Sequence, residues 1–175
     1  DCDFSRQDEV REIVISKLSQ QDNVGSGNAT STCLSVQENF WSFYNRLRGE
    51  KLSADISWVH EVPLKRDFSI IFNCYNSAFL SQLKEQPGRL IIPQDKFIYK
   101  ERTHPQDVII SLYHHNTGWL NPNTQSNNKK SFENHLLCTS NVVMCGHEHS
   151  NQDRKISSLS DSRELIYFES SALQY

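Results

Sequence analysis

Two apolar runs of this chain end in histidines, whose side chains can bind metal ions and transfer protons. The first run, 107–115, is rich in β-branched residues and ends in His114 and His115. The second, 141–149, ends in Gly-His-Glu-His, which places His147 and His149 two residues apart. Imidazole is the commonest metal-ligating side chain and is largely neutral near pH 7. Two buried strands that deliver histidines to one sheet edge therefore predict a metal site.

The expected position of these strands explains why their histidines should meet. In an open α/β sheet, ligands collect in the crevice outside the carboxyl ends of parallel strands. The loops there carry the chemistry, while the strands fix their positions. A turn or extended backbone after Gly146 can aim His147 and His149 into one small space. We therefore expect three histidines from two strand ends to converge.

The turn at 146–149, preceded by the strand that ends in His114-His115-Asn116 with Trp119 behind it, resembles the calcineurin-like metallophosphoesterases. The first four residues, Asp1-Cys2-Asp3-Phe4, are similar to the end of the Gly-Asn-His-Asp motif of that family. The resemblance implies that the chain is the C-terminal part of a catalytic domain. Its Asp-x-His, Gly-Asp-x-x-Asp and catalytic-His motifs would precede Asp1. The family's usual proline after the histidine pair is Asn116 here, so we expect a differently shaped loop.

The resemblance also implies a role for each matching residue. His114 and His147 match ligands of one metal ion, and His149 matches a ligand of a second ion. Asp1 would support the catalytic histidine of the missing motif. His115 stays open as an alternative ligand, a substrate contact or a strand-end residue. The implied cofactors are two divalent metal ions, of Mn, Fe or Zn.

The implied activity is hydrolysis of a phosphate mono- or diester by a water that two metal ions activate. The partner is thus a phosphate ester, with nucleic acid among the substrates that the family covers. Further domains of a larger parent protein are a second expected partner. Because several ligand motifs are missing, we expect the isolated chain to hydrolyse little. The alternatives are a degenerate relative that binds without catalysis and a metal-free interaction domain.

Other histidine chemistry is less favoured by the residue pattern. Structural zinc sites usually draw on close cysteine pairs, and Cys145 lies inside an apolar run where a small hydrophobe is expected. The sequence after Gly146 is also not His-Glu-x-x-His, so a zincin helix is not supported. The four-residue zinc set would be Cys138, Cys145, His147 and His149. Three histidines are expected to be structural only: His60, His104 and His135.

Composition limits the class of protein. With 175 residues, 37% of them hydrophobic, the chain is expected to form a single domain, 1–175. A net charge of −3 argues against a protein that holds nucleic acid mainly by a basic surface. The five cysteines show no Cys-x-x-Cys spacing, and no apolar run approaches the roughly 18 residues that span a bilayer. We therefore expect a reducing cytoplasm and no membrane.

The order of elements predicts an α/β fold, a layered α/β-β/α sandwich of the metallophosphoesterase type that is incomplete at its N-terminus. A helix should open at Ser5, and a second should follow the capping box Ser35-x-x-Glu38 and end at Gly49. A polar loop should fill 20–32. Asn73, Asn76 and Ser77 lie at the end of the strand 68–75 and should cap a helix over 78–85; the alternative for the polar amides is contact with a substrate or with a group behind the site. The remaining expected segments are strands 56–62, 68–75, 89–92, 155–159 and 164–169, helices 94–101 and 131–138, and a long loop over 116–130.

Overall fold

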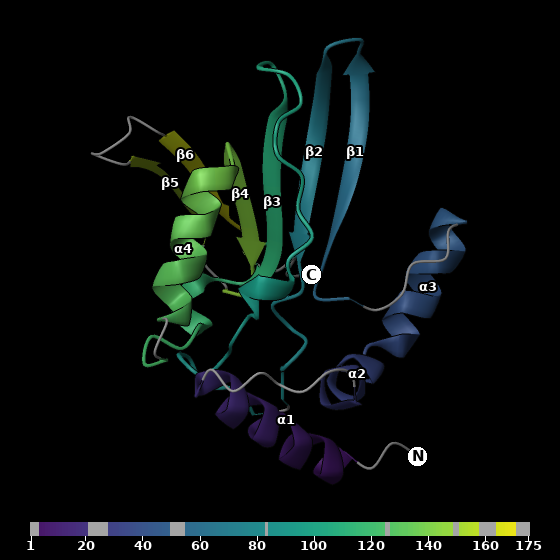
Figure 1. Ribbon diagram of the computed structural model, residues 1–175, viewed down its shortest axis with the longest axis vertical. Coiled ribbons are helices and arrows are strands. Elements are labelled where there is room, and N and C mark those ends of the chain that lie inside the picture. The colour runs from purple at the N-terminus through teal and green to yellow at the C-terminus, as the bar shows by residue number, and fades with distance from the viewer. Residues whose placement is uncertain are drawn as a thin grey trace.

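A computed structural model of the chain describes residues 4–20, 28–49, 55–82, 84–124, 127–148, 151–157 and 164–170. Six strands form one mixed sheet in the order β1-β2-β3-β4-β6-β5. Figure 1 shows α4 lying across one face of the sheet, α1 and α2 beyond the end at which β2, β3 and β4 finish, and α3 rising on the β1 side. The expected α/β class is therefore confirmed.

The direction of the strands decides where their side chains are delivered. β1 and β2 form an antiparallel hairpin, whereas β2, β3, β4 and β6 run parallel. β5 returns antiparallel to β6 at the sheet edge. The parallel strands consequently present their carboxyl ends at one edge. The strands are β1 (Ser57–Lys65), β2 (Phe68–Tyr75), β3 (Val108–His115), β4 (Val142–Gly146), β5 (Gln152–Ser157) and β6 (Glu164–Glu169).

Helices and short turns complete the described fold. The α-helices are α1 (Phe4–Ser19), α2 (Asn28–Ser35), α3 (Glu38–Arg48) and α4 (Asn128–Thr139). Two 3₁₀ turns, η1 (Gln94–Lys96) and η2 (Thr117–Trp119), lie in the connections around β3. None of the helices among these residues is long and apolar enough to cross a membrane.

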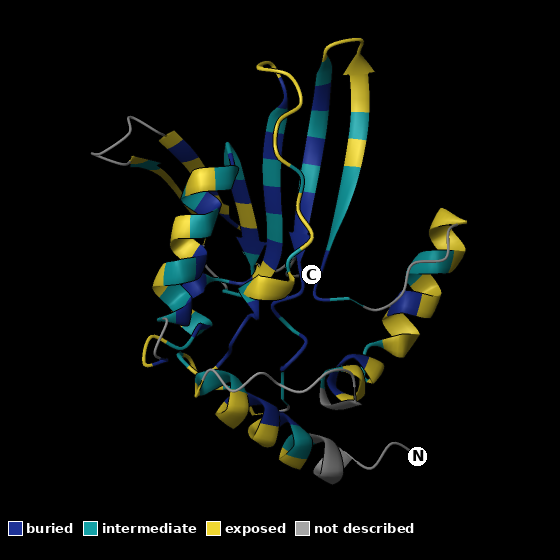
Figure 2. Ribbon diagram, viewed as in Figure 1, coloured by how far each residue is buried: buried dark blue, intermediate teal, exposed yellow. Residues whose placement is uncertain are grey.

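The core lies between α4 and the sheet face that it covers. Phe132 of α4 is fully buried, and its ring centroid lies 5.4 Å from that of Tyr75 and 5.3 Å from that of Tyr113. Side chains alternate between the faces of a strand, so Val143 is buried while its neighbour Met144 is 43% exposed. In Figure 2 the buried residues are concentrated along β2, β3 and the facing side of α4.

The opposite sheet face carries exposed apolar side chains. Met144 from β4 and Ile166 and Phe168 from β6 are between 41% and 46% exposed. Strands of parallel sheets normally have both faces covered. The residues that the structure describes supply one helical layer and one sheet, so the second sheet of the expected sandwich is not among them.

Several expected elements are confirmed. The strand 68–75 has the expected bounds, and α1 begins one residue before Ser5. Gly49 ends α3 in the left-handed conformation, with φ 67°, and its N–H donates to the carbonyl of Asn45. The strands near the C-terminus are present as β5 and β6.

Other expectations were wrong for identifiable reasons. α2 begins at Asn28, inside the expected loop, and the Ser35 hydroxyl donates to the Thr32 carbonyl instead of capping the next helix. The expected helix 94–101 reduces to η1, because Asn73 holds the Lys100 backbone through both its side-chain oxygen and nitrogen. The described part of 78–85 forms turns instead of a helix.

Candidate metal centre

Adjacent parallel strands bring three of the predicted histidines together. His115 of β3 pairs with Gly146 of β4, after a register shift beyond Leu112. The Nε2 of His114 lies 3.1 Å from the Nδ1 of His147. Each of these rings and that of His115 offers a nitrogen within 4.8 Å of the others. The convergence expected for residues 114 and 147 is therefore present in the fold.

The separation of the two facing nitrogens is suited to a shared cation. Zinc–nitrogen bonds of about 2.0–2.1 Å at a tetrahedral angle place two ligand nitrogens roughly 3.3 Å apart. The His114 and His147 nitrogens are 3.1 Å apart, so they fit this donor spacing without movement of the strands. Imidazole donors suit zinc, iron and other first-row transition ions.

The backbone at the end of β4 is shaped to aim His147 toward β3. His147 has φ 77°, a left-handed conformation that is uncommon for a residue with a side chain. Such conformations cost about 1–3 kcal/mol and cluster at functional sites. A Cβ atom on Gly146 would lie 3.6 Å from the Nδ1 of His114, so the imidazole rests directly over the glycine. The Gly-His turn thus holds both rings close together.

His115 is buried and held from both sides. Its side chain is 2% exposed, its Nε2 lies 3.0 Å from a Glu85 carboxylate oxygen, and its Nδ1 lies 3.4 Å from the Ser77 hydroxyl. Burial lowers the pKa of His115 to about 4 against the opposing charge of Glu85, so the ring is neutral at pH 7. His115 can bind a cation only by giving up one of these partners. Its expected substrate contact stays a prediction.

His114 lies nearer the surface and is also neutral. Burial lowers the pKa of His114, a positive charge on His147 lowers it further, and Glu85 opposes both effects. A neutral imidazole keeps the lone pair that a metal ion requires. His114 is therefore better placed as a ligand than the more enclosed His115.

Ser77 fixes the backbone of the histidine pair, a role that the sequence did not reveal. Its hydroxyl accepts the N–H of His114 at 3.1 Å and the N–H of His115 at 2.9 Å. The neighbouring Asn76 exchanges two side-chain hydrogen bonds with Gln37. The helix-capping role expected for Asn76 and Ser77 was wrong, because both side chains tie the end of β2 to other segments.

Polar side chains surround the histidines in a connected network. Trp119 donates its indole N–H to Glu148 at 2.9 Å, and its ring centroid lies 4.4 Å from that of His147. Asn116 donates to Glu169 at 2.7 Å, and the Tyr167 hydroxyl donates to the same carboxylate at 3.0 Å. Two carboxylates are thus held beside the histidines by fixed donors.

Sequence reasoning missed Glu85 and Glu169 for different reasons. Glu85 contacts His115 from a turn 30 positions earlier in the chain, where no local pattern marks it. Glu169 is the last residue of β6, just as the histidines lie at the ends of β3 and β4. A polar residue at the end of an apolar strand was therefore a signal that could have identified it. Asp1 and His149, both expected at the site, lie outside the described residues.

The competing structural-zinc set is not assembled among the described residues. Cys145 is buried, and its Sγ lies 2.9 Å from the Tyr167 hydroxyl on the core side of the sheet. Burial raises the pKa of Cys145 to about 11, which disfavours the thiolate that zinc requires. The other expected structural histidines lie away from the cluster; His60 contacts Arg48, and His135 contacts Tyr75.

No model of a known protein family matches the chain, and no curated protein matches it.

Proposed function

We propose that this chain supplies part of the divalent metal centre of a phosphoric ester hydrolase, the activity of a larger parent protein. The observation that carries the proposal is the 3.1 Å approach of the His114 and His147 nitrogens at the ends of neighbouring parallel strands. The resemblance of the Gly-His-Glu-His turn to metallophosphoesterases supplies the reaction class. The substrate is a phosphate mono- or diester, with nucleic acid among the candidates.

The donor set assigns roles to the histidines. His114 and His147 would hold one ion, and His149 would contribute to a second, with Mn, Fe or Zn as candidate metals. Bound ions of this kind lower the pKa of a coordinated water and offset charge on phosphoryl oxygens. Asp1 would support the general-acid histidine of the parent's preceding motif. His115 serves as a third metal ligand, or it packs against the His114 ring without binding metal.

The surrounding residues prepare the donors. Ser77 holds two backbone N–H groups, which sets where the His114 ring leaves β3. Burial keeps His114 and His115 neutral, so protons do not compete with a cation near pH 7. Glu148 accepts the Trp119 indole N–H, which keeps this carboxylate beside the histidine cluster in one orientation.

The exposed apolar sheet face supports a proposal for the parent's architecture. We propose that Met144, Ile166 and Phe168 pack against a second sheet, which completes the layered sandwich of the metallophosphoesterase type. Burial of such side chains stabilises a fold by about 1.5–3 kcal/mol each. We also propose a reducing cytoplasm, on the cysteine spacing of the sequence.

A metal titration of the chain tests the proposal. Isothermal titration calorimetry with Zn²⁺ and Mn²⁺ should show binding that His147→Ala weakens by at least tenfold, because one of the two closest donors is lost. His104→Ala is the matched control, since His104 is exposed and lies outside the cluster. Equal metal affinity in the wild type and in His147→Ala would refute the proposed metal site.

The reaction class needs the full-length parent. With Mn²⁺, a panel of phosphomonoesters and phosphodiesters should be turned over by the wild-type parent and not by its His147→Ala variant. Metal binding without turnover in the parent would favour the alternative of a degenerate relative that only binds.

A further inference from the structure

A groove of about 500 Å³ opens beside the candidate metal centre. It runs between α3 and the sheet, and His114 lines it together with residues from β1, β2 and β3. The volume falls within the roughly 300–1,000 Å³ typical of small-molecule pockets. Its principal lining residues are Phe40, Trp41, Trp58, Cys74, Leu112 and His114.

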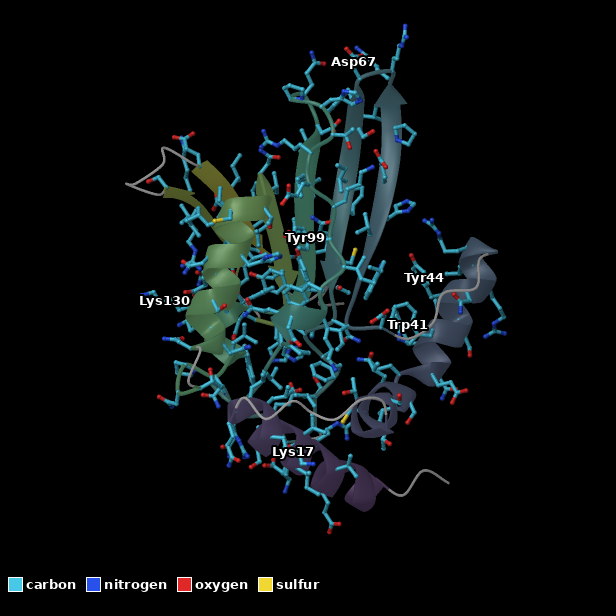
Figure 3. All side chains as sticks on the ribbon, viewed as in Figure 1. Lys17, Trp41, Tyr44, Asp67, Tyr99 and Lys130 are labelled. Carbon is cyan, nitrogen blue, oxygen red and sulfur yellow. The ribbon has the colours of Figure 1, made fainter. Side chains whose placement is uncertain are left out.

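The wall of the groove is aromatic. The ring centroids of Trp41 and Trp58 lie 4.9 Å apart in an edge-to-face arrangement, and Phe40 packs edge-to-face on Trp41 at 5.5 Å. Phe40 is 53% exposed, and its ring stacks on that of Tyr44 with the centroids 6.1 Å apart. In Figure 3, Trp41 and Tyr44 extend from the flank of α3 that faces the strands.

The position of α3 is fixed at the groove. Gln37, which immediately precedes the helix, and Asn76, which follows β2, exchange hydrogen bonds of 2.7 and 3.2 Å. Asn76 also donates to the carbonyl of Asp55 at 3.1 Å. These hydrogen bonds join the α3 wall of the groove to the β2 wall.

The described residues that line the groove include no Asp, Glu, Lys or Arg. Burial raises the pKa of Cys74 to about 11 and the pKa of Tyr75 to about 12, so both groups are neutral at pH 7. An uncharged aromatic surface favours an uncharged, flat occupant, because aromatic faces stack on one another and desolvate no ion.

One polar group in this wall lacks a partner. The indole N–H of Trp41 is buried and has no hydrogen-bond acceptor among the described residues, while Trp41 itself is 4% exposed. A buried donor without an acceptor is destabilising. A ring nitrogen or a carbonyl oxygen is the kind of group that would supply the missing acceptor.

We propose that this groove binds the neutral heteroaromatic ring of a phosphate ester whose phosphate lies at the histidine cluster. The inference rests on the proposed function and names its substrate class. The shared residue His114 makes the two sites continuous. An acyl chain would fill the same space without meeting the Trp41 donor, so the heteroaromatic ring is the better match.

Binding of matched ligands tests the groove. The Zn²⁺-loaded chain is titrated calorimetrically with adenosine 5′-phosphate and with ribose 5-phosphate, which lacks the base. Base–aromatic stacking of about 1–3 kcal/mol predicts at least fivefold tighter binding of adenosine 5′-phosphate. Phe40→Ala should remove most of this difference and leave ribose 5-phosphate binding unchanged. Phe43→Ala is the control, since Phe43 is equally exposed on the same helix but does not line the groove.

A third arm separates the groove from the metal centre. Adenosine without phosphate, added to metal-free chain, should bind weakly and lose affinity in Phe40→Ala. One outcome is that adenosine binds in this Phe40-dependent way while ribose 5-phosphate does not bind the Zn²⁺-loaded chain. That result would support ring binding in the groove and refute phosphate binding at the histidine cluster. Equal affinities for the base-containing and base-free phosphates, or equal losses in both Phe variants, overturn the groove. A Phe40-dependent dimer in sedimentation equilibrium would also overturn it, because a second copy would then be the occupant.

Discussion

Replacing Ser77 by alanine should loosen the histidine site without touching any histidine. The Ser77 hydroxyl accepts two backbone N–H groups, from His114 and His115, in a side chain that is 2% exposed. Alanine leaves both donors without this acceptor. A buried unsatisfied donor costs about 1–3 kcal/mol, and the His114 N–H is only partly buried. We expect a total loss of about 2–4 kcal/mol in unfolding free energy.

Two measurements follow the effect of Ser77→Ala. Urea unfolding monitored by tryptophan fluorescence should show the midpoint move to lower urea, with a melting temperature lower by roughly 5–15 °C. Zinc affinity should fall by at least tenfold, because the His114 ring leaves a less fixed backbone. The control is Ser111→Ala, which removes a buried hydroxyl of β3 that pairs with the Ser140 hydroxyl and lies outside the histidine cluster.

Ser111→Ala should lose about 1 kcal/mol of stability, the typical net worth of one hydrogen bond, and keep its zinc affinity. If Ser77→Ala also loses 1 kcal/mol or less and binds zinc as the wild type does, Ser77 does not position the histidine pair.

Three further predictions concern stability. The pKa of His115 is depressed to about 4, so between about pH 6.5 and pH 4 the unfolded chain binds more protons than the folded chain. The metal-free chain should therefore lose up to about 3 kcal/mol as pH falls through this window, and His115→Gln should flatten the urea midpoint measured against pH. Gly49→Ala should cost about 1 kcal/mol in the same unfolding assay, because φ is 67° and nothing lies within 4 Å to clash with the new methyl group. Asn128→Ala should cost about 2–4 kcal/mol, because the buried amide bonds both the N–H and the carbonyl of Ile92; an unchanged melting temperature would contradict this.

Local patterns in the sequence were sufficient for the elements that carry the histidines. β-branched apolar runs predicted β3 and β4, and the histidines at their ends predicted the cluster that the parallel register brings together. Both signals are local, since a strand end is marked by the change from apolar to polar residues. The C-terminal end of α3 was equally readable, because Gly49 occupies a left-handed position that other residues avoid.

Residues that act through distant partners could not be predicted. Ser77 and Asn76 looked like helix caps because polar residues after a strand often begin a helix. In the structure they bond to β3 and to Gln37, segments 37 to 39 positions away. Glu85 reaches His115 across a similar separation. No periodicity marks such contacts, because they depend on how the connections fold over the sheet edge.

The proton arrangement of the histidine pair links the present geometry to the proposed metal site. A hydrogen bond between the His114 Nε2 and the His147 Nδ1 needs one N–H and one lone pair. A cation shared by the same two nitrogens needs two lone pairs. One ring must therefore move its proton to its opposite nitrogen, and for His114 this is the Nδ1 that lies over Gly146. For His147 the opposite nitrogen is Nε2, so the ring that gives up its shared proton decides which of these two nitrogens carries the N–H when a cation is bound.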